Sequence, residues 1–475
     1  MTTTTADPAA MSATFDEAAR LTPVVHDCDL CVVGGSVTGV FAAVAAARLG
    51  LSVCVIEVGN QFGGNTTLGL VAVWHSLWNT TGDRQVIGGL TEEFVKRLKR
   101  RPLAVVETER TSPHWQFALN PAEAAIELDC LIREHRIRPF LHARVVACAR
   151  DGGVIRGVII EDKSGRRAIR AARFVDASGD ADLVKLAGGA TGVQDHLQPP
   201  TMAALVSGLA ALRAADPKFW LAKTVFDPAN PHALPPGFLW AFEPPSAADE
   251  SLVFGTRVHG VDCSDADHLT AAEMEGRRQV RQMIDALRHG YPGKAVALSA
   301  LPARIGVRET RHAVCAHRLT EDEVLSGELF PDAIAHSCYR VDIHKQGGEG
   351  LVFRYLDGRE IICGAVGTRS EGRWRPPQAV DPTFYSIPYR ALLPRGFANL
   401  VVAGRCLDAD AGAFGAVRVQ VTCNQMGEAA GTAAALSLQA GCAPAELDPQ
   451  RLRACLCAHG ARLAPEVQGA VASGR

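Results

Sequence analysis

The stretch CDLCVVGGSVTGV, residues 28–40, decides the fold of this chain. It nearly matches the pattern G-x-G-x-x-G, whose glycines turn a strand into a helix around a diphosphate. Gly34 and Gly39 hold the outer positions, Gly35 is an additional glycine, and Ser36 stands where the middle glycine is expected. Serine is small and its hydroxyl can donate to a phosphate oxygen. The stretch therefore still predicts a nucleotide-binding turn.

The residues around this turn complete a βαβ unit. The apolar run DLCVVG predicts a buried strand, the alanine-rich run VFAAVAAARLG predicts a helix that ends at a glycine, and LSVCVIEV predicts a second strand. Glu57 ends this second strand at about the spacing of the acid that binds a ribose hydroxyl. The helix N-terminus would supply free N–H groups to the phosphates. The alternative is a close-packed turn without a ligand.

Length and charge set the broad class. The chain has 475 residues, 47% of them hydrophobic, and a net charge of only −2. This composition is typical of a globular enzyme of more than one domain and does not favour a nucleic-acid partner. The N-terminus has no basic segment followed by an apolar one, and we find no apolar run of about 18 residues. We therefore expect a cytoplasmic protein without a membrane partner.

The fourteen cysteines are scattered, mostly within apolar runs. Cys28 and Cys31 form a C-x-x-C, and Cys455 and Cys457 a C-x-C, but neither has a second pair at zinc-ribbon spacing. The pattern predicts buried free thiols, a reducing compartment and no metal site.

Three further segments indicate which dinucleotide binds. The run GGNTTLGLV follows Glu57 and begins with Gly63 and Gly64. The segment from 141 to 183 reads as strands joined by turns at 151–153 and 164–165, and its last strand ends in VDASGD. Near the C-terminus, a strand, a glycine-bearing loop and a long alanine-rich helix follow one another in FANLVVAGRCLDADAGAFGAVRVQVTCNQMGEAAGTAAALS.

On these motifs the chain resembles the bacterial FAD-dependent oxidoreductase family that contains xanthan-lyase-associated proteins. Fumarate reductase flavoproteins and the tRNA wobble-uridine-modifying flavoprotein are its wider relatives. The resemblance implies an α/β fold with a Rossmann-like FAD-binding domain of the glutathione reductase/fumarate reductase type and an inserted α+β substrate domain. The division it implies is a leader at 1–24, the FAD-binding domain at 25–195 and 386–436, the insert at 196–385, and a C-terminal helix and tail at 437–475.

The resemblance also implies where FAD is held. Some relatives link FAD to a histidine after the two glycines, but Asn65, Thr66 and Thr67 stand there, so we expect non-covalent FAD. The residue after Gly404 is acidic in the wider family, so Arg405 is expected to contact FAD through its backbone. The FAD-contacting residues implied are Gly34, Gly35, Ser36, Thr38, Gly39, Glu57, Gly64, Asn65, Val145, Ala177, Ser178, Gly179, Gly404, Arg405, Arg418, Val419 and Gln420.

Candidates for the chemistry are histidines, arginines and a carboxylate. Alternation in CYRVDIH places Asp342 and His344 on one face of a strand, where the carboxylate could orient a proton-transferring imidazole or simply hydrogen-bond to it. Arg308 and Arg311, in ARIGVRETRH, could clamp a carboxylate or form an internal salt-bridge network. His75, in VAVWHSLWNT, would line the active site or pack in an aromatic loop.

These observations predict an FAD-dependent enzyme that oxidises or reduces a small organic substrate by hydride transfer at flavin N5. His114 is a weaker candidate, and Arg304 precedes the arginine pair. The chain shows no second nucleotide fingerprint, so the electron donor or acceptor would be external. A flavin-dependent monooxygenase, a tRNA-modifying flavoprotein, and a non-catalytic binding protein on the same fold are the alternatives. The sequence identifies neither the substrate nor the oligomeric state, for which a homodimer is one possibility.

Overall fold

A mixed sheet lies at the centre of the computed structural model, which describes residues 15–108, 116–235, 237–246, 249–345, 350–364 and 368–464. Its strand order is β6-β2-β1-β9-β8-β7, and β22 pairs with β9. The strands are β1 (Val24–Val33), β2 (Val53–Ile56), β6 (Arg138–Phe140), β7 (Arg144–Asp151), β8 (Val154–Asp162), β9 (Gly165–Asp176) and β22 (Leu400–Val402). The predicted strands on both sides of the glycine turn, and the predicted hairpins, are confirmed.

Parallel pairing dominates the part of the sheet next to the glycine turn. Strand β1 runs parallel to both β2 and β9, and β9 runs parallel to β22. Strands β7, β8 and β9 form an antiparallel ladder at the other edge. The chain therefore returns to the first sheet with β22, far later in the sequence, and the carboxyl ends of β1, β9 and β22 lie together.

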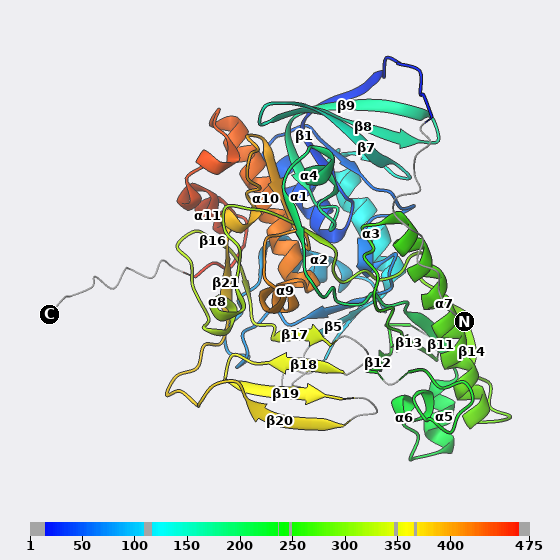
Figure 1. Ribbon diagram of the computed structural model, residues 1–475. Helices are drawn as coiled ribbons and strands as arrows, with labels where there is room; N and C mark the ends of the chain where they lie inside the picture. The colour runs from blue at the N-terminus through cyan, green and yellow to red at the C-terminus, as the bar shows by residue number, and fades with distance from the viewer. Residues whose placement is uncertain are drawn as a thin grey trace.

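Helices α1 (Val37–Arg48) and α10 (Gln420–Gln439) lie side by side against this sheet (Figure 1). Both are buried around nearly their whole circumference, which explains why they are rich in alanine and lack a polar face. The sequence prediction of a loop before α10 is wrong, because helix α9 (Ala411–Val417) lies within it. The Asp410 side chain caps α9 by accepting from the Ala413 N–H, and burial of the helix offsets its two glycines.

Two four-stranded antiparallel sheets follow between β9 and β22. The first has the order β12-β13-β11-β14 and is built from β11 (Ala204–Ser207), β12 (Trp240–Phe242), β13 (Glu250–Phe254) and β14 (Ala297–Ala300). A second hydrophobic core lies between this sheet and the long helix α7 (Ala266–Gly290). The other sheet has the order β17-β18-β19-β20 and lies at the end of the molecule opposite β7–β9 (Figure 1). Its strands are β17 (Val341–His344), β18 (Leu351–Arg354), β19 (Arg359–Cys363) and β20 (Arg369–Arg373).

Smaller elements connect these layers. The strands are β3 (Val73–His75), β4 (Val105–Glu107), β5 (Gln116–Leu119), β10 (Thr191–Val193), β15 (Arg311–Ala313), β16 (Ala333–Ser337) and β21 (Tyr385–Pro388). The helices are η2 (Gly64–Thr66), α2 (Gly89–Leu98), α3 (Pro121–Glu134), α4 (Asp182–Leu186), α5 (Leu209–Ala215), α6 (Leu221–Val225), α8 (Glu321–Leu325), η5 (Tyr389–Leu392), η6 (Pro444–Glu446) and α11 (Pro449–Ala458). Among the described residues, no helix is both long enough and apolar enough to cross a membrane. The domain boundaries stay a prediction.

Candidate functional site

The glycine turn joins β1 directly to α1. Ser36 is the N-cap of α1, and its hydroxyl accepts from the Gly39 N–H. A Cβ at Gly39 would lie 1.9 Å from the Gly34 carbonyl oxygen, and one at Gly34 would lie 2.3 Å from the Ala177 carbonyl oxygen. A Cβ at Gly35 would collide with Phe62. Contacts within the protein therefore already require these glycines, and the small residues alone do not show that a ligand binds.

Electrostatics around the turn do fit a diphosphate. The first turn of α1 contains no acidic residue, so the partial positive charge of the helix N-terminus is not neutralised. Gly64 lies against Ser36, and a Cβ at Gly64 would come 3.6 Å from the Arg304 guanidinium. A helix N-terminus, a serine hydroxyl and an arginine thus meet at one place, which suits an anionic phosphate group.

Glu57 follows β2 and is almost completely buried beside the turn. Its carboxylate accepts from the Gly35 N–H at 2.8 Å and from the Gly59 N–H at 2.7 Å. Arg304 lies 3.7 Å from the same carboxylate. Because a carboxylate has room for about four hydrogen bonds, Glu57 can also accept from a ribose hydroxyl. Its contact with ribose stays a prediction.

The predicted adenine and central contacts come from β7 and from the end of β9. Val145 is half-buried on β7, next to the segment in which the Ala143 N–H donates to the Glu57 carbonyl. The Ala177 N–H donates to the Val33 carbonyl, which holds the loop after β9 against the end of β1. The Ser178 hydroxyl donates to Asp176. The loop after β9 therefore borders the carboxyl end of β1, and the segment just before β7 is joined to the carboxyl end of β2.

The Arg405 side chain makes contacts within the protein, and its backbone contact with FAD stays a prediction. Its guanidinium lies 3.2 Å from the Asp180 carboxylate and packs over Gly179. Gly404, at φ +87°, approaches the Thr38 side chain of α1. The loop after β22 thus contacts both the first turn of α1 and the loop after β9.

The N-terminus of α10 is joined to the segment that follows the two glycines. The Gln420 side-chain oxygen accepts from Trp74 Nε1 at 2.9 Å and from the Thr66 hydroxyl, and its Nε2 donates to the Val71 carbonyl. Val419 is the N-cap residue and supplies no side-chain cap. This helix end is therefore fixed in place and carries no neutralising side chain, as the negatively charged pyrimidine end of a reduced flavin requires. The Asn65 side chain instead donates to the Val307 carbonyl.

A cluster of three arginines lies close to this helix end. Arg418 immediately precedes Val419, and its guanidinium lies 3.4 Å from the Asp342 carboxylate. Arg257 and Arg308 both donate to the Thr201 hydroxyl, at 3.0 Å and 2.5 Å. We call Arg257, Arg308 and Arg418 the arginine cluster. Within the ranges described, the salt bridge from Asp342 to Arg418 is its only ion pair to a carboxylate.

Asp342 and His344 are brought to this cluster by β17. His344 Nε2 lies 3.7 Å from the Asp342 carboxylate, and His344 Nδ1 accepts from Arg257 Nε at 3.2 Å. The Tyr339 hydroxyl donates to Asp342 at 2.9 Å, and the Tyr339 ring packs on His75 at 4.2 Å between centroids. The predicted placement of Asp342 and His344 on one face is confirmed. Their catalytic roles stay predictions, as does that of His75.

Burial and the excess positive charge lower the pKa values of several ionisable groups in and beside the arginine cluster. Burial, together with Arg257 and Arg418, holds the pKa of Arg308 well below its ordinary range. Burial lowers the pKa of Arg257 to about 10. Burial and the three arginines hold the pKa of His344 well below its ordinary value, so this imidazole is neutral. The protein therefore maintains an unbalanced positive site at a cost in stability, which is common at functional sites.

Four buried atoms in or beside the arginine cluster have no hydrogen-bond partner among the described residues. They are Arg257 Nη2, Arg418 Nε, His259 Nδ1 and the Asp342 oxygen Oδ1. Buried polar atoms without partners are unusual and costly. A bound anion would satisfy the two arginine donors. Arg257 and His259 were not predicted, because they come from an irregular segment without a periodic pattern. Tyr339 lies in the alternating run CYRVDIH, but nothing in that pattern distinguishes it as a site residue.

The other predicted residues lie elsewhere. Arg311 pairs with Asp182 at 2.6 Å and does not join Arg308. Arg304 lies at the glycine turn, as described above. His114 lies outside the described residues.

Comparison with known proteins gives one family match. The family described as FAD dependent oxidoreductase matches residues 29–456. A search of the curated proteins finds no significant match. The chain is also similar to a geranylgeranyl bacteriochlorophyll reductase-like protein from Thermoplasma acidophilum, at 11% identity and a TM-score of 0.42, covering 90% of this chain and 82% of that one. It is likewise similar to a myxobacterial chondrochloren halogenase, at 14% identity and a TM-score of 0.44, covering 91% of this chain and 78% of that one.

Proposed function

The chain belongs to the FAD-dependent oxidoreductase family, and on this premise we propose that it oxidises or reduces a small anionic organic molecule, such as a carboxylate. FAD is the cofactor that the family implies. We propose that it is bound without a covalent link, since Asn65, Thr66 and Thr67 follow the two glycines. When bound, FAD would supply hydride exchange at its N5 position.

The arginine cluster is the observation that carries this proposal. Three guanidinium groups face one carboxylate, and two of them have buried atoms without a partner. Arg418 is adjacent in sequence to the helix end that we expect at the flavin, so an anion held there would lie beside the cofactor. The cluster would bind and orient the substrate, because guanidinium groups match carboxylates in geometry and charge.

His344 would then respond to the substrate. In the structure its Nδ1 accepts from Arg257, so the neutral ring carries its proton on Nε2, facing Asp342. A bound anion would offset the guanidinium charge that lowers the pKa of His344. It would also attract the Arg257 guanidinium and free Nδ1 to accept a proton. His344 would thus become a proton acceptor only with substrate in place.

We further propose that the chain is one of the xanthan-lyase-associated members of the family and that its substrate domain is inserted between β9 and β22. We also propose a cytoplasmic location, supported by cysteines that are free thiols. The electron donor or acceptor would be an external small molecule or protein.

Replacing Arg257 with methionine tests the anion site. We expect mono- or dicarboxylates to perturb the flavin absorption of the wild-type holoprotein, and the Arg257→Met variant to bind them about 10- to 100-fold more weakly. A hydrogen bond to a charged group contributes about 1.5–3 kcal/mol, which is a factor of this size. Spectral titration measures the dissociation constants, with the uncharged amide of each acid as a second ligand.

Arg278→Met, at an exposed position on α7, is the matched control and should bind carboxylates like the wild type. Equal binding of acids and amides by the wild type would contradict an anion site. So would unchanged carboxylate binding by Arg257→Met, provided that the variant retains its flavin.

The absorption spectrum tests the cofactor. We expect the purified protein to show flavin bands, and acid precipitation to release all of the colour into the supernatant. Colour that stays in the pellet would indicate a covalent link and overturn the non-covalent assignment. A colourless protein that does not take up added FAD would instead favour a non-catalytic binding protein on this fold.

A further inference from the structure

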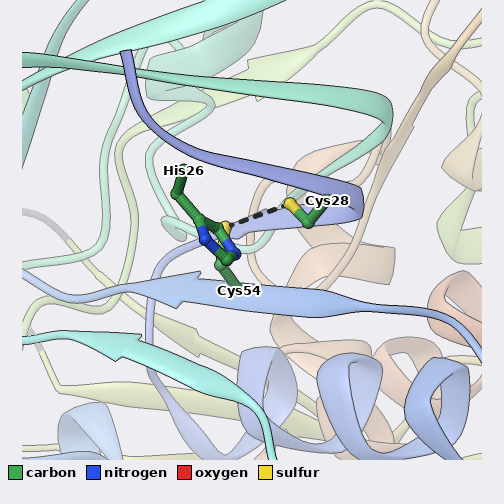
Figure 2. A group of neighbouring side chains, drawn as sticks. All are labelled: His26, Cys28 and Cys54. Carbon is green, nitrogen blue, oxygen red and sulfur yellow. Dashed lines mark hydrogen bonds between the residues drawn. The ribbon is translucent and has the colours of Figure 1, made fainter. Parts of the chain in front are cut away.

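A group of soft metal ligands lies where β1 and β2 meet, away from the glycine turn. The sulfur atoms of Cys28 and Cys54 are 3.6 Å apart. The ligand atoms of His26, Cys28 and Cys54 all lie within 4.8 Å of one another. Figure 2 shows the imidazole of His26 next to the Cys54 sulfur, with a dashed line between the two sulfurs. The three residues come from two strands of the central sheet.

The distances suit a tetrahedral ion. Zn²⁺ binds cysteine sulfur at about 2.3 Å, so two sulfurs on a regular tetrahedron would be separated by about 3.8 Å. The separation of 3.6 Å requires little adjustment. A disulfide is much shorter, at about 2 Å between sulfurs, so forming one would require the two thiols to approach considerably.

The histidine, His26, also offers a nitrogen that has no partner within the described part of the protein. Its Nε2 is buried and finds no hydrogen-bond partner among the residues that the structure describes. Buried polar atoms normally have partners, so this nitrogen is short of one.

We propose that His26, Cys28 and Cys54 bind one Zn²⁺ ion, with water in the fourth position. Binding would release the two thiol protons, and the two thiolates would balance the charge of the ion. A neutral complex can be buried at low cost, whereas a lone thiolate in this place cannot. Cys28 and His26 are only half-buried, so ion and water can enter from this side. The glycine turn lies beyond the other end of β1, so this metal site would be separate from the expected flavin site.

Zinc titration of the reduced holoprotein tests the site. After treatment with a chelator, the wild type should bind one equivalent of Zn²⁺ in competition with a chromogenic chelator. Bound Co²⁺ should show thiolate charge-transfer absorption. We expect Cys28→Ser and His26→Gln to weaken Zn²⁺ binding at least about 100-fold, and Zn²⁺ to raise the melting temperature of the wild type but not of these variants.

Cys457→Ser, at an exposed cysteine on α11, is the control and should still bind one equivalent of Zn²⁺. Flavin content and circular dichroism show whether each variant is folded, and both substituted positions are partly exposed. The proposal would be overturned if the wild type bound no equivalent of Zn²⁺ tightly, or if Cys28→Ser bound Zn²⁺ as tightly as the wild type. Mass spectrometry that finds a Cys28–Cys54 disulfide, together with no Zn²⁺ uptake after reduction, would identify a redox pair instead.

Discussion

Replacing Gly431 with alanine is expected to destabilise the protein by about 2–4 kcal/mol, although alanine is the better helix former. Gly431 lies in the middle of α10, where propensity alone would favour alanine by about 1 kcal/mol. A Cβ there would come 1.9 Å from the Ala42 carbonyl oxygen of α1, and one at Gly427 would come 2.0 Å from the Thr38 carbonyl oxygen. Overpacking of a core costs about 1–3 kcal/mol and more when no flexible group can yield. The cost of the collision therefore exceeds the gain in propensity.

The obstacle at both glycines is backbone, so relief would require α1 and α10 to separate. Both helices begin at the expected cofactor site, and their separation would displace the two helix ends that should face the phosphates and the flavin. We therefore expect Gly431→Val to lose FAD as well as stability. Denaturant unfolding and the flavin-to-protein absorbance ratio measure the two effects.

Gly192→Ala is the control for this series. A Cβ at Gly192 meets nothing within 4 Å, and this glycine lies on β10, far along the chain from both helices. Gly192→Ala should therefore change the free energy of unfolding by no more than about 0.5 kcal/mol. If Gly431→Ala were as stable as the wild type, the two helices would not approach as closely as the structure shows.

Local patterns were sufficient for the first βαβ unit and for the β7–β9 ladder. The apolar run before Gly34, the alanine-rich run after Gly39 and the turns at 151–153 and 164–165 are signals within short windows. Helix α9 was missed because a short helix with two glycines has the composition of a loop. What stabilises it is burial and a cap from Asp410, and burial is a property of the whole fold.

The arginine cluster could not be predicted as a group. Arg257, Arg308 and Arg418 are far apart in the sequence, and only the folded chain brings them together with Asp342. Spacing placed Arg308 with Arg311, but the two side chains point to different partners, Thr201 and Asp182. The alternation that put Asp342 and His344 on one face was informative, because a strand fixes the direction of alternate side chains. The close contact of α1 with α10 likewise involves residues nearly 400 positions apart.

Replacing Glu428 with glutamine is expected to stabilise the protein by up to about 3 kcal/mol at pH 9 and to have little effect at pH 4. Glu428 is buried on α10, and its carboxylate accepts from the Leu90 N–H in the first turn of α2. Burial raises the pKa of Glu428 from its ordinary value of 4.5 to about 7. At 1.36 kcal/mol per pH unit, this rise corresponds to about 3 kcal/mol.

The sign follows from proton linkage. Below pH 4.5 the carboxyl group is protonated in both the folded and the unfolded chain, so it contributes no difference. Between pH 4.5 and about 7 the unfolded chain loses the proton while the folded chain keeps it, so stability falls as the pH rises. Above about pH 7 the folded chain carries a buried charge at a constant cost. Glutamine never ionises and can still accept from Leu90.

Unfolding by denaturant at pH 4, 7 and 9 should therefore show a gap between Glu428→Gln and the wild type that widens with pH. Glu134→Gln, at an exposed carboxylate paired with Arg97, is the control and should show no such widening gain. A gap that does not change with pH would mean that Glu428 has the same pKa in the folded and the unfolded chain, and a gap that shifts in favour of the wild type as the pH rises would mean that Glu428 is already charged in the folded protein at low pH. In that case the α2 N-terminus and nearby Arg48 would outweigh burial, and Glu428 would act as a charged cap that holds α2 against the same helix whose N-terminus should face the flavin.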